Sequence, residues 1–301
     1  MRGAAGRKSS RLLAIAVAVL TSLLVAGCAT SGPTGRPGVS QAGDPTTAES
    51  SPAPVHASGP NRHPSAPASG PAAHSHQAKP LAGKIVGIDP GHNGRNGTDP
   101  AYLAQQVFNG RTMENCDTTG TQTAAGYTES QFNFNVAMYL ATDLRRDGAH
   151  VVLTRRNNGS LGPCVNKRAT ILNRTDVAID IHADGGPTWG RGFTVLEPVA
   201  DGPNNKVIAS SVRFGRYVHQ AFLADTPMRV SDYYGHDGYQ FRNDLAGLNL
   251  TTVPKVLIEC GNMPNPADAA LLSSARVQRV IARALEAAII RFLMGTWRLR
   301  Y

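Results

Sequence analysis

Apolar positions fall into short runs that alternate with amphipathic stretches over the last two thirds of the chain. Runs rich in Val, Ile and Leu predict five buried strands, at residues 84–89, 150–155, 177–182, 192–197 and 255–260. Apolar residues at helical spacing predict four helices between and after them, at residues 128–148, 165–174, 207–223 and 277–293. Strands that alternate with helices predict an α/β fold, a mostly parallel twisted sheet with helices on both faces.

The amino terminus has the pattern of an export signal. Four basic residues precede an apolar stretch at residues 12–26 that is too short for a comfortable membrane span. The stretch ends in Val25-Ala26-Gly27-Cys28, which resembles the lipobox at which bacterial lipoproteins are cleaved and acylated. We therefore predict a lipoprotein signal peptide at residues 1–28 and a lipid on Cys28, which would anchor the protein to the outer face of the cytoplasmic membrane, in the periplasm or cell envelope. An ordinary signal peptide with a chance cysteine is the alternative, and it also predicts export.

Residues 29–80 are almost entirely Ala, Gly, Pro, Ser, Thr and His. Such a segment cannot bury enough apolar surface to offset the entropy lost on ordering, so we expect a disordered tether with solvated histidines. The remaining residues, 81–301, are enough for one well-buried catalytic domain. The net charge is +9. The domain shows no run of Lys and Arg interleaved with aromatic residues, so we expect no nucleic-acid partner.

Export would place the remaining cysteines in an oxidising compartment, which favours pairing. Cys116 and Cys164 both lie in loop-like sequence near turn-forming residues, and we predict a disulfide between them. Two free loop thiols are the alternative. Cys260 ends an apolar strand and is expected to be a buried free thiol.

Three predicted strands run into ionisable residues. The first leads to His92, the third ends at His182, and the fifth ends at Glu259. Ligands of open α/β sheets sit outside the carboxyl ends of the strands, so parallel strands would bring these side chains to one rim. Glu129, at the start of the first long helix, could lie over the same rim. Two imidazoles and one carboxylate form a typical catalytic zinc set, and a second carboxylate can serve as general base.

Structural roles are the alternative for each of these residues. A histidine after a strand is often only a hydrogen-bonding residue, and an acidic residue in the first turn of a helix complements the helix dipole. Residue types alone leave this choice open.

The ordered motifs closely resemble the zinc-dependent N-acetylmuramoyl-L-alanine amidase family, the catalytic domain called amidase type 3. The resemblance covers essentially all of residues 84–293 and rests on five segments: IVGIDPGHNG, YTESQFNFNVA, VVLTRRNN with NKRATILN, VAIDIHADGG and VLIECGNMPNPADAALL. Carried over residue by residue, it implies one zinc ion per domain, held by His92, Glu129 and His182. It makes Glu259 the general base that takes a proton from water and passes it to the leaving nitrogen of L-alanine.

The resemblance also implies roles for two further residues and the class of substrate. Arg168 matches the family's helix arginine and is either structural or substrate-orienting, and Asp184 is a candidate substrate-binding residue. The implied substrate is peptidoglycan or a muropeptide, acted on by a monomer during wall remodelling, daughter-cell separation or fragment recycling.

The sequence departs from the usual family pattern in a long polar excursion at residues 98–126, which contains Cys116 and resembles mycobacterial members. No long inserted helix of the kind that blocks autoinhibited members is evident, so we expect an open groove. Without a separate wall-binding module, the lipid anchor and tether would localise the protein. Two other functions remain open: a lipoprotein that binds wall fragments without cutting them, and a zinc peptidase acting on the stem peptide.

Overall fold

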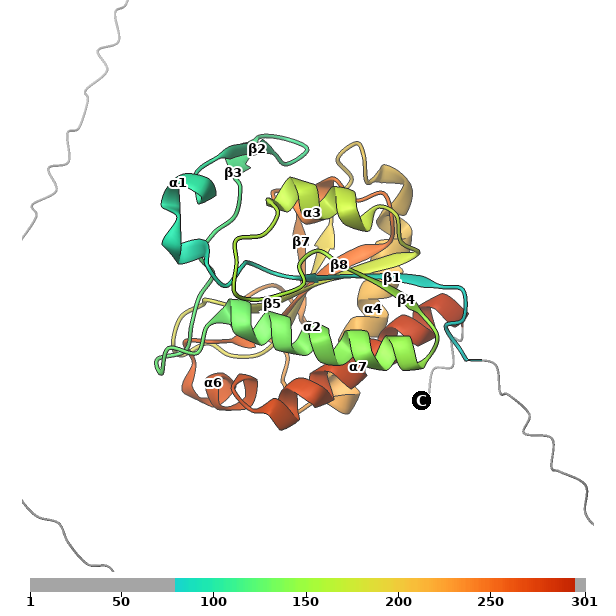
Figure 1. Ribbon diagram of the computed structural model, residues 1–301. Helices are drawn as coiled ribbons and strands as arrows, with labels where there is room; N and C mark the ends of the chain where they lie inside the picture. Colours follow the sequence, from blue (N-terminus) through green and yellow to red (C-terminus); the bar gives the residue numbers. More distant parts are fainter. Residues whose placement is uncertain (1–78, 296–301) are drawn as a thin grey trace, which may run out of the picture. The chain divides into compact units, whose positions relative to one another are not determined.

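The computed structural model describes residues 79–295, and the predicted signal peptide, Cys28 and nearly all of the predicted tether lie outside that range. Its main element is a six-stranded sheet with the order β4-β1-β5-β8-β6-β7 (Figure 1). The strands are β1 (Ile85–Pro90), β4 (His150–Leu153), β5 (Val177–Asp184), β6 (Thr194–Pro198), β7 (Tyr239–Arg242) and β8 (Lys255–Asn262). Strands β4, β1, β5 and β8 are mutually parallel.

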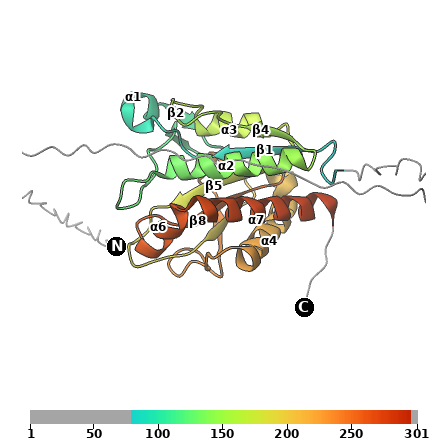
Figure 2. The ribbon, with the colours of Figure 1, turned by 60° about the horizontal axis from the view of Figure 1, so that its bottom comes forward.

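Helices cover both faces of this sheet, as the alternating pattern predicted. Figures 1 and 2 show three long helices, α2 (Glu129–Arg146), α4 (Ile208–Asp225) and α7 (Ala275–Met294), on one side, together with α6 (Pro266–Leu272). The short helices α3 (Val165–Leu172) and α5 (Ala246–Asn249) lie on the other side. The main core forms between the long helices and the sheet, around buried residues such as Ile88, Phe132 and Leu285.

Capping groups fix where the long helices begin. The side chain of Thr128 accepts a hydrogen bond from the backbone N–H of Gln131, which satisfies one of the free donors at the start of α2. The side chain of Gln131 does not complete a capping box by returning to the backbone of Thr128, because it bonds with Asn135 and Asn158 instead. Ser274 caps α7 in the same way, and Gly295 ends it in the left-handed conformation that glycine favours.

Several elements were not predicted from the sequence. Strand β6 was predicted at residues 192–197, but its antiparallel direction relative to β8 was not, and neither was β7, which pairs parallel to β6 at the edge of the sheet. The excursion between β1 and α2 contains the four-residue helix α1 (Pro100–Leu103) and a hairpin of β2 (Gln106–Phe108) and β3 (Met113–Asn115). These elements are only three or four residues long, so no periodicity could reveal them. Within residues 79–295, no helix combines the length and the apolar character needed to cross a bilayer.

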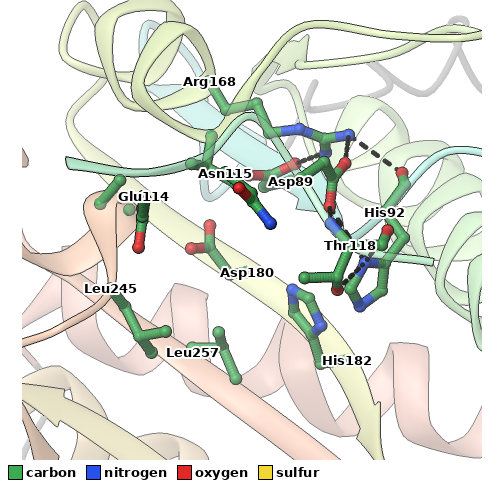
Figure 3. A pocket seen from close by; sticks show the side chains of 15 residues that line it. Asp89, His92, Glu114, Asn115, Thr118, Arg168, Asp180, His182, Leu245 and Leu257 are labelled. Carbon is green, nitrogen blue, oxygen red and sulfur yellow. Dashed lines mark hydrogen bonds and ion pairs between the residues drawn. The ribbon is translucent and has the colours of Figure 1, made fainter. Parts of the chain in front are cut away.

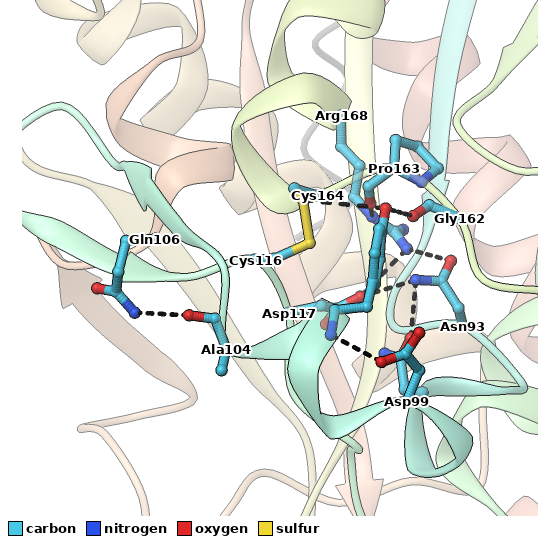
Figure 4. Close-up of a disulfide and its surroundings, with 12 residues drawn as sticks. Asn93, Asp99, Ala104, Gln106, Cys116, Asp117, Gly162, Pro163, Cys164 and Arg168 are labelled. Carbon is cyan, nitrogen blue, oxygen red and sulfur yellow. Dashed lines mark hydrogen bonds and ion pairs between the residues drawn. A yellow bond between two sulfur atoms is a disulfide. The ribbon is translucent and has the colours of Figure 1, made fainter.

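A disulfide joins Cys116 and Cys164, the pair expected from the sequence (Figure 4). It ties the loop after β3 to the residue that precedes α3. Cys260 is a buried free thiol, also as expected.

Candidate active site

His92 lies just beyond β1 in a backbone conformation that is uncommon for a residue with a side chain. Its φ is 57°, a left-handed value that costs free energy unless the surroundings enforce it. The preceding residue must be glycine, because a Cβ at Gly91 would collide with the imidazole of His182. Close backbone approach therefore lets the two imidazoles lie in an edge-to-face arrangement, with ring centroids 4.9 Å apart.

Glu129 lies between the two histidines, in the first turn of α2. Its Oε2 is 3.2 Å from Nε2 of His92, and its Oε1 is 2.9 Å from Nδ1 of His182. Each of the three residues offers one ligand atom, and these atoms lie within 4.8 Å of one another. The first turn of a helix and the ends of two parallel strands thus bring together residues that are 90 positions apart in the sequence.

Asp117 and Thr118 fix the orientation of the His92 ring. Nδ1 of His92 is 3.1 Å from Oδ1 of Asp117 and 3.1 Å from the carbonyl oxygen of Thr118. Both partners are acceptors, so Nδ1 carries the proton and Nε2 faces Glu129. Metal-binding histidines are typically held in this manner by a carboxylate or carbonyl on the second ring nitrogen.

Burial and neighbouring charges shift the pKa values of His92 and Glu129 in opposite directions. Burial lowers the pKa of His92, but the Glu129 carboxylate and the hydrogen bond to Asp117 outweigh it and raise that pKa well above its usual range. Burial raises the pKa of Glu129, yet the charge of His92 and the hydrogen bonds from both histidines hold it well below its usual range. The cluster therefore favours an ionised carboxylate beside its imidazoles.

Arg168 lies behind this cluster, almost fully buried in α3. Its guanidinium donates to Oδ1 of Asp89 at 2.5 Å, to the carbonyl oxygen of His92 at 3.0 Å and to Oδ1 of Asn93 at 2.7 Å. It also lies 3.4 Å from Oδ2 of Asp117 (Figure 4). These contacts hold the strained His92 backbone and its carboxylate partner in place.

Glu259 lies beside the cluster on β8, opposite His182 in the strand register. Within the described residues, its buried Oε2 has no hydrogen-bond partner. Burial raises the pKa of Glu259 well above its usual range, and the charges of Glu129 and Asp184 raise it further. The residue lines a cavity of about 290 Å³ that also contains His92, Glu129 and His182. An acid with a raised pKa at the wall of such a cavity is suited to exchange protons with a ligand.

Asp184 lies on the same cavity wall, two residues beyond His182. Its Oδ2 accepts a hydrogen bond of 2.6 Å from the hydroxyl of Tyr233. Its Oδ1 accepts a hydrogen bond from the backbone N–H of Gly185. Both oxygens of Asp184 therefore have partners within the protein, unlike Oε2 of Glu259.

A second recess of about 170 Å³ adjoins the histidines on the side of the β2–β3 hairpin (Figure 3). Glu114 and Asn115 of the hairpin, Leu245 and Leu257 line it together with Asp180. Burial raises the pKa of Asp180 to about 6, although fully buried Lys255 lies only 2.8 Å away. The recess thus extends the cavity beyond the histidines with a partly acidic lining.

Sequence reasoning missed the residues that support the cluster. Asp117, Asn93 and Tyr233 make key contacts but lie in loops without regular patterning. The one available signal was that Asp117 directly follows Cys116, whose predicted disulfide would fix its position.

The donor set fits a zinc ion. Two ligands at about 2.1 Å from a tetrahedral zinc lie about 3.4 Å apart. The separation between His92 and Glu129 is 3.2 Å, and the candidate ligand atoms of all three residues lie within 4.8 Å of one another. The fold and site together are those of an α/β domain with a candidate mononuclear metal centre. Comparison with known proteins gives the family: the family model described as N-acetylmuramoyl-L-alanine amidase matches residues 86–291, and this chain belongs to that family.

Similar proteins support this assignment over most of the domain. The N-acetylmuramoyl-L-alanine amidase Rv3717 of Mycobacterium tuberculosis is 42% identical over 217 residues, which cover 71% of this chain and 88% of that protein. The crystal structure of the amidase Ami1 from Mycobacterium smegmatis matches with a TM-score of 0.68 and 39% identity, over 72% of this chain and 99% of that one. Ami1 from Mycobacterium abscessus matches with a TM-score of 0.66 and 38% identity, over 71% and 100%. The protein is therefore a peptidoglycan amidase that acts outside the cytoplasm.

Proposed function

We propose that this amidase holds one zinc ion with His92, Glu129 and His182 and hydrolyses the amide between N-acetylmuramic acid and L-alanine. The observation that carries the proposal is the combination of three clustered ligand atoms with a separate carboxyl group, that of Glu259, whose buried Oε2 has no partner within the described residues, on the same cavity. Amide hydrolysis needs both parts, because the carbonyl must be polarised and a proton must move from water to nitrogen.

The protein's own residues would perform the proton transfers. A bound zinc ion would polarise the lactyl carbonyl group and make water more acidic. Glu259 accepts a proton from the attacking water as its oxygen bonds to the carbonyl carbon, and it then delivers that proton to the L-alanine nitrogen as the C–N bond breaks. The products are a muramic acid carboxylate and a peptide with a free amino terminus. Asp117 and Arg168 would hold His92 in its binding orientation throughout.

We further propose that Cys28 carries a lipid and that residues 29–80 tether the domain to the outer face of the membrane. The lipobox-like sequence supports the anchor, and the Pro-rich composition supports the tether. Such placement would suit wall remodelling, separation of daughter cells or recycling of fragments.

Substitution of Glu259 by Gln tests the assignment of the base. We expect kcat on a muramoyl-peptide to fall by roughly 10²–10⁴-fold while zinc remains bound at one equivalent, because Glu259 is outside the ligand set. The His182→Ala variant should instead lose both zinc and activity. Zinc content is measured by elemental analysis and products by mass spectrometry.

The products also separate the competing functions. An intact peptide beginning with L-alanine supports the amidase proposal, whereas cleavage within the stem peptide would assign the protein to the peptidases. Zinc binding without cleavage of any fragment would favour a wall-binding protein. Full activity of Glu259→Gln would refute its role as base.

A further inference from the structure

The loop between β5 and β6 is built around a buried amide. Asn262, fully buried at the end of β8, accepts a hydrogen bond of 2.9 Å from the backbone N–H of Gly186. Its Nδ2 donates to the carbonyl oxygens of Pro187 and Gly190, each at 2.7 Å. All hydrogen-bonding atoms of this side chain are thus used to hold one short loop, since an amide offers two donors and one acceptor group.

Further contacts hold the same loop from both sides of residue 189. Asn265 donates to the carbonyl oxygen of Thr188 at 2.9 Å. On the other side, fully buried Asp268 accepts from the backbone N–H of Gly192 at 2.7 Å and from Arg191. Buried, satisfied polar networks of this kind make a backbone rigid. The loop is therefore fixed on both sides of Trp189.

Trp189 itself projects into water from this rigid loop. Its exposed fraction is 72%, the highest among the exposed large apolar side chains of the described residues. Tryptophan buries a large apolar area and is enriched at binding interfaces, so an exposed indole on a rigid loop is a candidate ligand contact. A fixed ring also loses little conformational entropy on binding.

The position of the loop relates Trp189 to the candidate active site. Asn262, which holds the loop, is three residues beyond Glu259 on β8, about 10 Å along the strand at 3.3 Å per residue. Asn262 also pairs with Asp184 of β5 in the register. Gly185 lines the cavity that contains the candidate metal ligands and lies four residues before Trp189, so the two Cα atoms are at most about 14 Å apart. A short oligosaccharide that starts in the cavity can span this distance.

We propose that Trp189 is a sugar-stacking residue that binds the glycan strand next to the muramic acid whose amide is cleaved. The inference rests on the proposed function for the identity of the glycan, a chain of N-acetylated amino sugars. One face of a pyranose ring presents C–H groups and is apolar, so it packs on a flat indole while the hydroxyl groups stay in water. The ring would add affinity for sugars beyond the cleavage site without touching the reacting bond.

Binding of tetra-N-acetylchitotetraose tests this proposal without catalysis. The sugar carries no peptide, so its binding is independent of amide hydrolysis. Titration calorimetry should show binding that is weakened roughly two- to tenfold in Trp189→Ala and partly restored in Trp189→Phe. Phe241→Ala is the matched control, because Phe241 is 59% exposed on the edge strand β7 and its removal should leave the affinity unchanged. The chain contains only two tryptophans, so Trp297→Phe also allows the fluorescence of Trp189 to be followed directly.

Kinetics separate the two proposals. In Trp189→Ala, KM should rise for muropeptides with several sugars and stay unchanged for a muramoyl-peptide with one sugar. Equal affinity of wild type and Trp189→Ala for the tetrasaccharide, an equal loss in Phe241→Ala, or no binding at all would overturn the sugar-stacking role. If the wild type binds the sugar through Trp189 but cleaves no muropeptide, the proposed function fails and the binding role stands.

Discussion

Asp117→Asn probes how far the loop carboxylate controls the candidate metal site. Oδ1 of Asp117 contacts Nδ1 of His92 at 3.1 Å and the N–H of Thr118 at 2.7 Å. Its Oδ2 accepts from Asn93 at 3.0 Å and lies 3.4 Å from Arg168. All four partners are donors, so the NH₂ group of an asparagine must face at least one of them. The substitution therefore changes few atoms but removes a charge and creates an unsatisfied contact.

The expected loss follows from these contacts. Removing a hydrogen-bonded partner of a metal-binding histidine typically lowers metal affinity 10–100-fold, which corresponds to about 1.4–2.7 kcal/mol. An unsatisfied buried polar group adds about 1–3 kcal/mol of lost folding stability. Zinc affinity is measured by competition with a chromogenic chelator, and stability by urea unfolding of the metal-free protein.

Asp99→Asn is the matched control for this experiment. Asp99 lies in the same excursion but only caps α1, by accepting from the N–H of Tyr102. Asparagine caps helices equally well, so both readouts should stay at their wild-type values. If Asp117→Asn binds zinc within threefold of the wild type and unfolds at the same urea concentration, the supporting role of this carboxylate is wrong.

Three other predictions concern stability. Cys116→Ser/Cys164→Ser opens a loop whose ends are 48 residues apart and should cost about 4 kcal/mol in the free energy of unfolding; unchanged unfolding under non-reducing conditions would contradict this. Burial raises the pKa of Glu197 to about 7, so its contribution to stability is complete below pH 4.5 and is lost as the pH rises through 7. Glu197→Gln should therefore raise the free energy of unfolding at pH 8 by about 1–2 kcal/mol, after discounting for partial solvent screening, and change it little at pH 4.5. An equal change at both pH values would refute the raised pKa of Glu197. Zinc at about 100 times its Kd should stabilise the wild type by about 2.7 kcal/mol in thermal melts, and Glu259→Gln should retain this gain whereas His182→Ala should not.

The sequence predicted that the cluster residues lie close together because the carboxyl ends of parallel strands meet at the same edge of a sheet. Apolar runs located β1, β5 and β8, and their shared direction predicted that His92, His182 and Glu259 would meet at one rim. The alternation of strands and helices also predicted helices on both faces of the sheet. Both inferences depend on periodicity, which long regular elements display clearly.

Loops and short edge elements could not be predicted in this way. β7 has four residues of mixed polarity. Its pairing depends on the antiparallel direction of β6 relative to β8, which the local sequence pattern does not indicate. The left-handed conformation of His92 depends on contacts with Arg168 and on the absence of a side chain at Gly91. The Asn262 network is likewise formed by tertiary contacts between groups distant in sequence.

Because Cys116 and Cys164 are joined by a disulfide, complete formation of this active site depends on an oxidising environment. The disulfide joins the residue next to Asp117 to the residue before the helix that carries Arg168, and both of those side chains support His92. Thiols stay reduced in the cytosol of most bacteria and pair in oxidising compartments. A chain still inside the cell would lack this cross-link, and the loop would be secured only after the protein reaches the compartment where its substrate is.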